Sequence, residues 1–279
     1  MAAPIIPADT PLSRLISLAG RAAVVTGAAR GFGYHIARRL AEAGAGVLLG
    51  DRDAAGAREA AAAIARNYGV DAQASELEVS DPRSVAALAD RAVALFGGID
   101  IWINNAGIYY GHALIDTDDD EWRTLNEVNL RGTFLGCRES ARRMVAAGDA
   151  PGRVIINIAS VAGVRGRVSL GAYSAAKSGV IGLTRAAAVE LAPHNIRVLC
   201  VTPSMAETPG VAEMRAAAAG QSGSGNTIAA MEASVVASFL LGRTAQADEI
   251  ARVVLFCASD LAAFMTGSNI LVDGGLTAR

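Results

Sequence analysis

The sequence predicts a single α/β domain in which a doubly wound, parallel sheet of seven strands is flanked by helices. Short apolar runs alternate with amphipathic stretches along most of the 279 residues, and no internal repeat or domain-boundary linker interrupts them. The apolar runs are continuous, which is typical of parallel strands that are buried on both faces. With 52% hydrophobic and 19% charged residues, the chain can bury a large core, so disordered and fibrous proteins are excluded.

The elements follow from these runs in chain order, each strand leading into a helix or loop. The predicted strands are the short apolar runs at 22–26, 46–50, 71–77, 100–104, 153–159, 196–201 and 270–272. The predicted helices are the amphipathic stretches at 32–43, 54–67, 82–96, 121–147, 172–191 and 247–258. Because strands and helices alternate, each strand is expected to pair in parallel with its neighbours.

Two segments fall outside this alternation. Residues 1–14 contain three prolines and no basic stretch, so we expect a tail outside or along the domain rather than a signal peptide. The main domain is then expected over residues 15–279. Within it, residues 204–244 are rich in Ala, Gly and Ser, which predicts a mobile lid closing over an apolar substrate, or else a disordered insertion.

Charge and cysteine content exclude several classes of protein. The net charge of −2 provides no basic excess for binding nucleic acid or an anionic membrane surface. No apolar run reaches the ~18 residues that span a bilayer, so we expect a soluble, cytoplasmic protein. The three cysteines lack metal-site spacing and the three histidines are scattered, so no disulfide framework and no metal site is expected.

A glycine-rich turn follows the first strand and opens the first helix. Glycines let the backbone approach a pyrophosphate closely, and a helix N-terminus presents free N–H groups to it. This context, typical of a Rossmann-like fold, predicts a phosphate-binding turn. Its candidate cofactor-binding residues are Gly27, Arg30, Gly31, Phe32 and Gly33.

Asp51 ends the second strand, where a carboxylate can accept hydrogen bonds from an adenosine ribose and repel a 2′-phosphate. This favours NAD as the cofactor. Arg30 and Arg52 argue the other way, because either could pair with a 2′-phosphate. Asp51 could also be a solvated loop acid or part of the cap of the next helix.

Tyr173 and Lys177 are four residues apart, so they share one face of the predicted helix. Ser160 directly follows the apolar run that ends at 159, at the strand end where a doubly wound fold places its chemistry. Lys177 is the only lysine among 25 basic residues, which indicates a position where arginine would not serve.

Taken together, these motifs resemble those of the short-chain dehydrogenase/reductase family. The resemblance covers residues 18–279 and rests on the glycine turn 26–33, the NNAG stretch 104–107, Asn129, Ser160 and the YxxxK pair. It implies that Tyr173 is the general acid/base, that Ser160 holds the reacting oxygen and that Lys177 binds the nicotinamide ribose and lowers the Tyr173 pKa. Asn129 is implied to keep a water in a proton relay.

The resemblance also assigns further residues to the cofactor and the substrate. Asn105, Ala106 and Gly107 are implied to back the cofactor, Thr208 to touch the nicotinamide amide, with Thr202 as the alternative, and Glu78 to reach the adenine edge or to be an exposed acid. Pro203 is followed by Ser204 where the family has glycine, so a different local backbone is expected. Residues 161–167 are implied to border the substrate, and 109–112 either line the pocket or form a surface loop.

An ordinary phenol, with a pKa of ~10, is a poor base at neutral pH. A neighbouring ammonium and a positively charged nicotinamide both favour the phenolate. Together with the resemblance, this predicts an NAD-dependent enzyme that interconverts a small to medium, mostly apolar secondary alcohol and a ketone by direct hydride transfer. The alternatives are an NADPH-dependent ketone or 3-oxoacyl reductase and a non-catalytic protein that senses the cofactor. The resemblance further implies a homotetramer.

Overall fold

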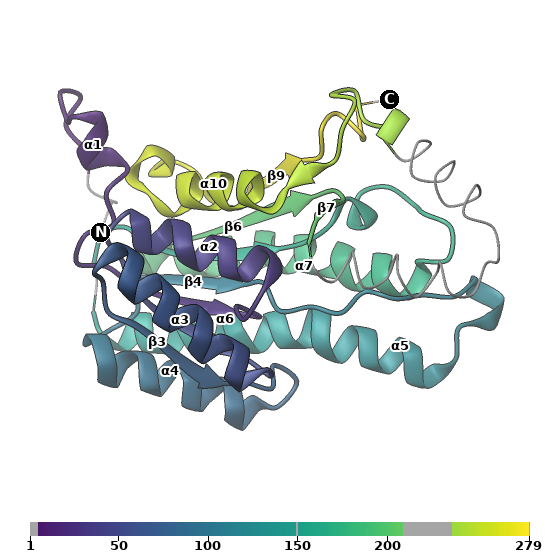
Figure 1. Ribbon diagram of the computed structural model, residues 1–279, viewed down its shortest axis with the longest axis horizontal. Helices are drawn as coiled ribbons and strands as arrows, with labels where there is room; N and C mark the ends of the chain where they lie inside the picture. The colour runs from purple at the N-terminus through teal and green to yellow at the C-terminus, as the bar shows by residue number, and fades with distance from the viewer. Residues whose placement is uncertain (1–4, 149, 209–235, 279) are drawn as a thin grey trace.

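The computed structural model describes residues 5–148, 150–208 and 236–278. Within these ranges, seven strands form one parallel sheet in the order β3-β2-β1-β4-β5-β6-β9 (Figure 1). The strands are β1 (Ala22–Thr26), β2 (Gly46–Asp51), β3 (Ala72–Glu76), β4 (Ile101–Asn104), β5 (Arg153–Ile158), β6 (Ile196–Pro203) and β9 (Asn269–Val272). The predicted fold class and the seven-stranded parallel sheet are therefore confirmed.

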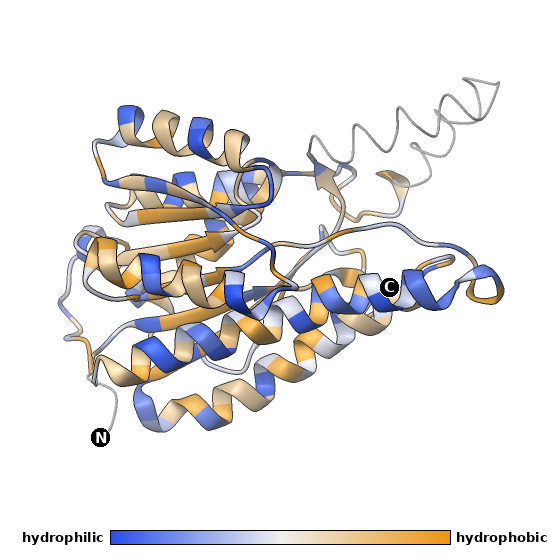
Figure 2. Cartoon of the chain, turned by 90° about the horizontal axis from the view of Figure 1, so that it is seen from below, coloured by the Kyte–Doolittle hydropathy of each residue, from blue (hydrophilic) through white to orange (hydrophobic). Residues whose placement is uncertain are grey.

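Six of the described helices form two layers, one on each face of this sheet. The bounds of the described helices are α1 (Leu12–Leu15), α2 (Gly31–Glu42), α3 (Ala54–Tyr68), α4 (Pro82–Phe96), α5 (Asp119–Asn126), α6 (Gly132–Ala146), α7 (Gly171–Leu191) and α10 (Ala247–Ala258). Buried side chains of α2, α3 and α10 pack on one face, and those of α4, α6 and α7 pack on the other. The strands are mostly hydrophobic, whereas the helices mix hydrophobic and hydrophilic residues (Figure 2).

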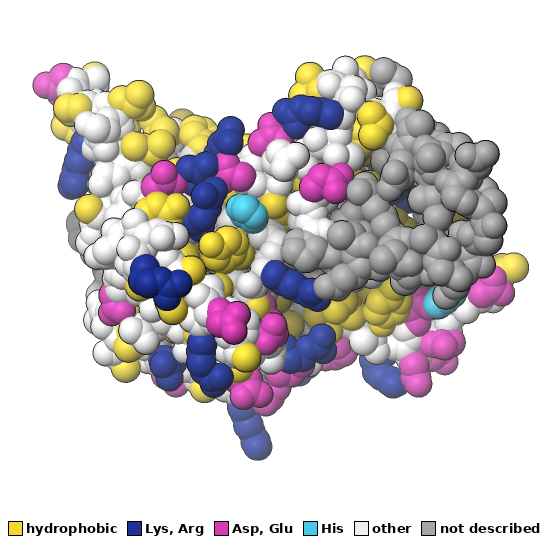
Figure 3. Space-filling model, in the orientation of Figure 1, with side chains coloured by type: hydrophobic (Ala, Val, Ile, Leu, Met, Phe, Trp, Pro, Cys, Tyr) yellow, Lys and Arg dark blue, Asp and Glu magenta, His cyan; other side chains and the backbone are white. Residues whose placement is uncertain are grey.

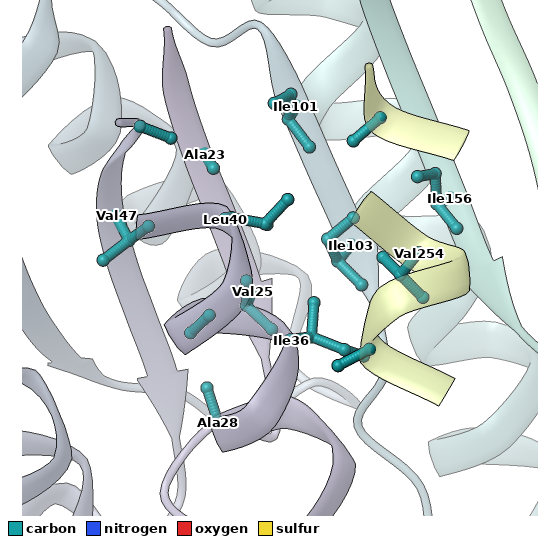
Figure 4. Packing of buried hydrophobic residues seen from close by; sticks show 14 of the residues in the cluster. Ala23, Val25, Ala28, Ile36, Leu40, Val47, Ile101, Ile103, Ile156 and Val254 are labelled. Carbon is teal, nitrogen blue, oxygen red and sulfur yellow. The ribbon is translucent and has the colours of Figure 1, made fainter. Parts of the chain in front are cut away.

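Successive side chains along each strand point to opposite faces of the sheet. Val25 and Ile103 belong to the core beneath α2 and α10 (Figure 4). Val24 and Trp102 belong to the opposite core. Because both faces are covered, β1, β4 and β5 are buried along their whole length. This explains the continuous apolar runs in the sequence.

The long helix predicted over 121–147 contains an irregular turn. The single helix expected over 121–147 is divided into α5 and α6 by a π-helical segment, η2 (Glu127–Arg131). Asn129 lies inside η2, and its side-chain Nδ2 donates to Leu125 O at 3.0 Å and to Ile108 O at 3.1 Å. Extra turns of this kind often occur at functional sites, where they re-aim a side chain.

The segments outside the alternation are described only in part. α1 contains no buried residue and projects from the domain near the N-terminus (Figure 1). Of the lid expected over 204–244, residues 209–235 lie outside the described residues. On either side of that gap, β7 (Ala206–Glu207) pairs in parallel with β8 (Ala245–Gln246). Among the described helices, none is both long and apolar enough to cross a membrane.

Candidate active site

Most of the predicted cofactor-binding residues lie at or just beyond the carboxyl ends of the strands. The chain leaves β1 toward β2 on one side, and β4 pairs with β1 on the other, so the direction of strand progression reverses between β1 and β4. Ligands of doubly wound sheets bind in the crevice outside such a reversal. The glycine turn that follows β1 and the NNAG stretch that follows β4 meet at this point.

The glycine turn is packed so closely that side chains are excluded from it. Gly27 has a φ of 65°, and a Cβ there would lie 2.7 Å from the Cα of Ala106. A Cβ on Gly33 would overlap the carbonyl oxygen of Gly27 and lie 2.6 Å from Asn105 Nδ2. The two motifs are therefore in direct backbone contact, which requires glycine at both positions.

Asn105 and Thr26 hold this contact together. Asn105 Nδ2 donates to the carbonyl oxygens of Thr26 and Gly27, both at 2.9 Å. In return, Thr26 Oγ1 accepts from the backbone N–H groups of Asn105 and Ala106, both at 3.0 Å. Thr26 was not among the predicted site residues. The available signal was a hydroxyl residue at the end of a buried strand, directly before the turn.

A cavity of about 490 Å³ opens above this contact. Ten of the predicted cofactor-binding residues line it: Gly27, Arg30, Gly31, Phe32, Asp51, Glu78, Asn105, Ala106, Gly107 and Thr208. Six further residues complete the lining: Arg52, Leu77, Val79, Ile108, Tyr109 and Val128. Gly33 lies beneath the turn instead, and Pro203 ends β6. The cavity thus brings together residues from the ends of four strands.

The two acids of the cavity are held by backbone N–H groups. Asp51 Oδ2 accepts from Ala29 N at 2.9 Å, and its Oδ1 accepts from Asp53 N at 3.0 Å. The side-chain cap of α3 is Asp53, not Asp51, because Asp53 Oδ1 accepts from Gly56 N. Glu78 Oε1 accepts from both the backbone N–H and the hydroxyl of Ser80. Asp51 is thereby fixed in the cavity wall, next to the glycine turn.

Ser160, Tyr173 and Lys177 come together behind the cavity. Ser160 caps the short helix η3 (Val161–Gly163), and its Oγ accepts from Ala162 N at 3.2 Å. Its hydroxyl also lies beside Tyr173, where it acts to lower the pKa of that phenol. Lys177 lies one turn further along α7, with its Nζ 5.8 Å from the centroid of the Tyr173 ring. That Nζ donates to Ile158 O at 2.9 Å, at the end of β5.

Burial controls the protonation of both α7 residues. Burial raises the pKa of Tyr173 to about 12, although the neighbouring Ser160 hydroxyl acts in the opposite direction. Burial also lowers the pKa of Lys177 to about 8. The free protein therefore differs from the sequence expectation of a lowered tyrosine pKa. The physical reason is that desolvation penalises the phenolate and the ammonium at the same time.

Asn129 joins the site through the loop that follows β4. Its Oδ1 accepts from Ile108 N at 3.2 Å while its Nδ2 donates to Ile108 O, so the side chain pairs with both backbone groups of that residue. A Cβ on Gly107 would lie 2.7 Å from the same Oδ1. These contacts fix the loop, and the water-holding role of Asn129 stays a prediction.

The departures at the end of β6 have small consequences. Among the described non-glycine residues, only Ser169 and Asn195 have positive φ, so Ser204 follows Pro203 without left-handed strain. Thr208 reaches the cavity, with its methyl group 3.9 Å from the place of a Cβ on Gly31. Within the described ranges, no group of three or more His, Cys, Asp or Glu residues is placed to hold a metal ion.

Comparisons with known proteins agree with this geometry. A family model described as enoyl-(acyl carrier protein) reductase matches residues 27–277. The cis-4-hydroxycyclohexanecarboxylate dehydrogenase of Sinomonas cyclohexanicum is 42% identical, over 94% of this chain and 98% of that protein. The 3-oxoacyl-(acyl-carrier-protein) reductase of Aquifex aeolicus is 36% identical, over 94% of this chain and 99% of that protein.

A solved structure is similar over nearly the same length. The short-chain type dehydrogenase/reductase from Mycobacterium marinum has a TM-score of 0.85 and 34% identity, covering 95% of this chain and 98% of its own. Sequence and structure matches thus extend over the glycine turn, the NNAG stretch and the YxxxK pair alike. The chain belongs to the short-chain dehydrogenase/reductase family.

Proposed function

We propose that this protein is an NAD-dependent dehydrogenase that reversibly oxidises a secondary alcohol to a ketone. As a short-chain family oxidoreductase, it acts on CH–OH groups. The observation that carries the finer proposal is the placement of the Ser160 hydroxyl beside Tyr173, with the Lys177 ammonium one turn away, behind a glycine-lined cavity. This combination supplies a proton acceptor, a group that holds the reacting oxygen and a dinucleotide site in one crevice.

The cavity fits a dinucleotide on its own geometry. Side chains are excluded at Gly27 and Gly33, so the turn leaves a smooth cradle at the N-terminus of α2, where a phosphate is favoured. When bound there, a nicotinamide cofactor supplies the hydride acceptor. Lys177 Nζ has three N–H donors, one of which is given to Ile158 O, so it retains donors for a ribose hydroxyl.

Tyr173 and Ser160 act directly on the alcohol in this proposal. Ser160 Oγ holds the substrate oxygen, and Tyr173 takes its proton as the carbonyl forms. Because burial raises the pKa of Tyr173 to about 12 in the free protein, the phenol is protonated at neutral pH and can donate in the reverse direction. Alcohol oxidation needs the phenolate, so its rate should rise with pH. The Lys177 ammonium favours the phenolate.

The proposed substrate is a ring-shaped or otherwise compact secondary alcohol. Apolar lining near the site and the 42% identity to a hydroxycyclohexanecarboxylate dehydrogenase support this choice. The deciding experiment measures absorbance of reduced cofactor with NAD or NADP and a panel of cyclic and linear secondary alcohols. Absence of turnover throughout, with normal cofactor binding, would favour the non-catalytic, cofactor-sensing protein instead.

A reductase that uses NADPH is the second candidate. It is favoured by Arg30 and Arg52, which both line the cavity beside Asp51 and carry the charge that a 2′-phosphate needs. The 36% identity to a 3-oxoacyl reductase points in the same direction. NAD remains the proposal because the Asp51 carboxylate is fixed by two backbone N–H groups and cannot move away from an incoming phosphate without breaking them.

Cofactor choice gives a direct prediction. Asp51→Ala is expected to weaken NAD binding and to raise kcat/KM for NADP, by about tenfold each, because one charge-assisted hydrogen bond and one repulsion disappear. Asp51→Asn is the matched control: it removes the charge but still offers one acceptor to the turn, so it should separate repulsion from loop support. A wild-type protein with higher kcat/KM for NADP than for NAD contradicts the proposal.

The proposed setting is the cytoplasm, and the proposed assembly is a homotetramer. The assembly rests on the family and on exposed apolar side chains at one sheet edge, where Leu271 lies on β9 and Phe264 is fully exposed. Such side chains are more common where surfaces associate. Light scattering of the purified protein measures the assembly directly.

A further inference from the structure

An exposed histidine is paired with a nearly buried carboxylate beside the active site. His112 Nδ1 lies 2.6 Å from Glu121 Oε2, and the two side chains are 65% and 8% exposed. Glu121 is the third residue of α5, a position from which a carboxylate often turns back to the N-terminus of its own helix. Here the carboxylate reaches across to His112 instead, so the pair ties the loop that follows β4 to α5.

The loop from Ile108 to His112 is fixed at three points. At its start, Asn129 pairs with both backbone groups of Ile108. In its middle, Gly111 packs so closely on Ser169 that a Cβ would overlap the Ser169 carbonyl oxygen. At its end stands the pair of His112 with Glu121. A surface loop without a role would not need three anchors within five residues.

Of the two tyrosines between these anchors, Tyr109 contacts the active site. Its ring lies edge-on to the Tyr173 ring, with centroids 5.1 Å apart and an interplanar angle of 87°. Tyr109 also lines the cofactor cavity, and it is half exposed. It therefore forms a wall shared by the cavity and the proton-transfer residue, on the side open to a substrate.

The helix that receives the anchor also packs on Tyr173. Leu125 lies one turn after Glu121 on the same face of α5, and it is fully buried in a cluster with Tyr173 and Leu170. Leu125 O additionally accepts from Asn129 Nδ2. The pair of His112 with Glu121 thus joins the Tyr109 loop to the helix that positions the Tyr173 ring.

We propose that His112 and Glu121 are positioning residues of the active site: through Tyr109 they fix the orientation of the alcohol against Tyr173. This inference rests on the proposed alcohol oxidation. The edge-to-face geometry of the two rings sets the width of the substrate site, and a shift of one ring by about 1 Å is enough to misplace a reacting group.

The pair also makes substrate binding dependent on pH. Its hydrogen bond and charge raise the pKa of His112 above its usual value, and Asp116 and Asp118 act in the same direction. Acidic side chains gather over this end of α5 (Figure 3). Two basic residues, Arg165 and Arg167, lie on the segment that leads to Ser169, the residue packed against Gly111. Arg165 donates to Leu276 O, and Arg167 is exposed; neither contributes to the raised pKa of His112. The pairing of His112 with Glu121 is strongest below the raised pKa of His112, where the imidazole is charged. It weakens as the pH rises through that pKa.

The first measurement follows the histidines themselves. The chain has three, so the imidazole signals can be assigned by substitution and titrated by NMR in the free protein. We expect the His112 pKa to lie above the ordinary ~6.5 and to fall in Glu121→Gln. An ordinary His112 pKa that Glu121→Gln leaves unchanged means that the pair does not form, and it overturns the inference without any assay of turnover.

The second measurement is steady-state kinetics. His112→Ala is expected to raise the alcohol KM about tenfold and to leave the cofactor Kd unchanged, because only the substrate wall moves. His112→Gln should bring the alcohol KM most of the way back to the wild-type value, since the glutamine amide can still donate to Glu121. Because glutamine does not titrate, this variant should not show the rise of alcohol KM with pH that is expected of the wild type. The matched control is Asp120→Asn, which breaks the exposed pair with Arg123 on the same helix and should change neither quantity.

The outcomes separate the two levels of the argument. Wild-type turnover, together with an unchanged alcohol KM and pH profile in His112→Ala and Glu121→Gln, overturns the positioning role alone. No oxidation of any alcohol by the wild type overturns the proposed function and the inference with it. Equal losses in cofactor Kd and alcohol KM indicate general damage to the fold and also contradict positioning through Tyr109.

Discussion

Replacing Lys177 by arginine is expected to lower the turnover number for alcohol oxidation by about 10²–10⁴. Lys177 is only 4% exposed, and its Nζ is enclosed by Ile158 O, the Tyr173 ring and the backbone of Gly107. Arginine is wider, and its five N–H donors point in fixed directions. Arginine should therefore lose the contact with the ribose and hold its positive charge in a different place relative to Tyr173.

The pH profile separates this mechanism from simple crowding. A misplaced charge stabilises the Tyr173 phenolate less, so residual oxidation in Lys177→Arg should require higher pH than in the wild type. Lys177→Met is the matched variant, since it removes the charge without adding bulk and should shift the profile in the same direction. Circular dichroism should show that both variants are folded. Near-normal turnover with an unchanged profile in Lys177→Arg contradicts the assigned role.

Replacing Gly33 by alanine is expected to weaken cofactor binding by about 100-fold. The added Cβ would overlap the carbonyl oxygen of Gly27 and press on Asn105 Nδ2, so the glycine turn must open or the NNAG stretch must retreat. Overpacking of this kind also lowers the free energy of unfolding by about 1–3 kcal/mol. Cofactor fluorescence titration and thermal melting measure the two effects separately.

Gly182→Ala is the control for this substitution. Gly182 lies on α7, where nothing is within 4 Å of an added Cβ. Alanine should therefore leave cofactor binding unchanged and raise the free energy of unfolding by about 0.5–1 kcal/mol, because it favours the helix. If Gly33→Ala binds the cofactor as tightly as Gly182→Ala does, the glycine turn is not the phosphate cradle.

Much of the candidate site could be predicted because its residues stand at the ends of apolar runs. The glycine turn, Asp51 and Asn105 each follow a predicted strand, and parallel strands end at the same edge of a sheet. Ten of the predicted cofactor residues accordingly line one cavity. Thr26 was missed because its contribution is a pair of hydrogen bonds accepted from the loop that follows β4, about 80 residues further along the chain, which no local pattern records.

Protonation was the least predictable property. The sequence placed Lys177 one helical turn from Tyr173, and a nearby ammonium lowers a phenol pKa in water-accessible surroundings. In the fold, both groups are buried, and burial raises the pKa of Tyr173 to about 12 and lowers that of Lys177 to about 8. Desolvation depends on everything packed around a side chain, so spacing alone could not weigh it against the charge.

By itself, the sequence determined the fold class, the order of the strands along the chain and the residues that gather at the sheet edge. These follow from hydrophobic period and turn chemistry, which are local. Only the tertiary structure decided the π-helical turn at Asn129, the pairing of His112 with Glu121 and the edge-on contact of Tyr109 with Tyr173. These features depend on how side chains and neighbouring segments pack, which local propensity and periodicity do not record.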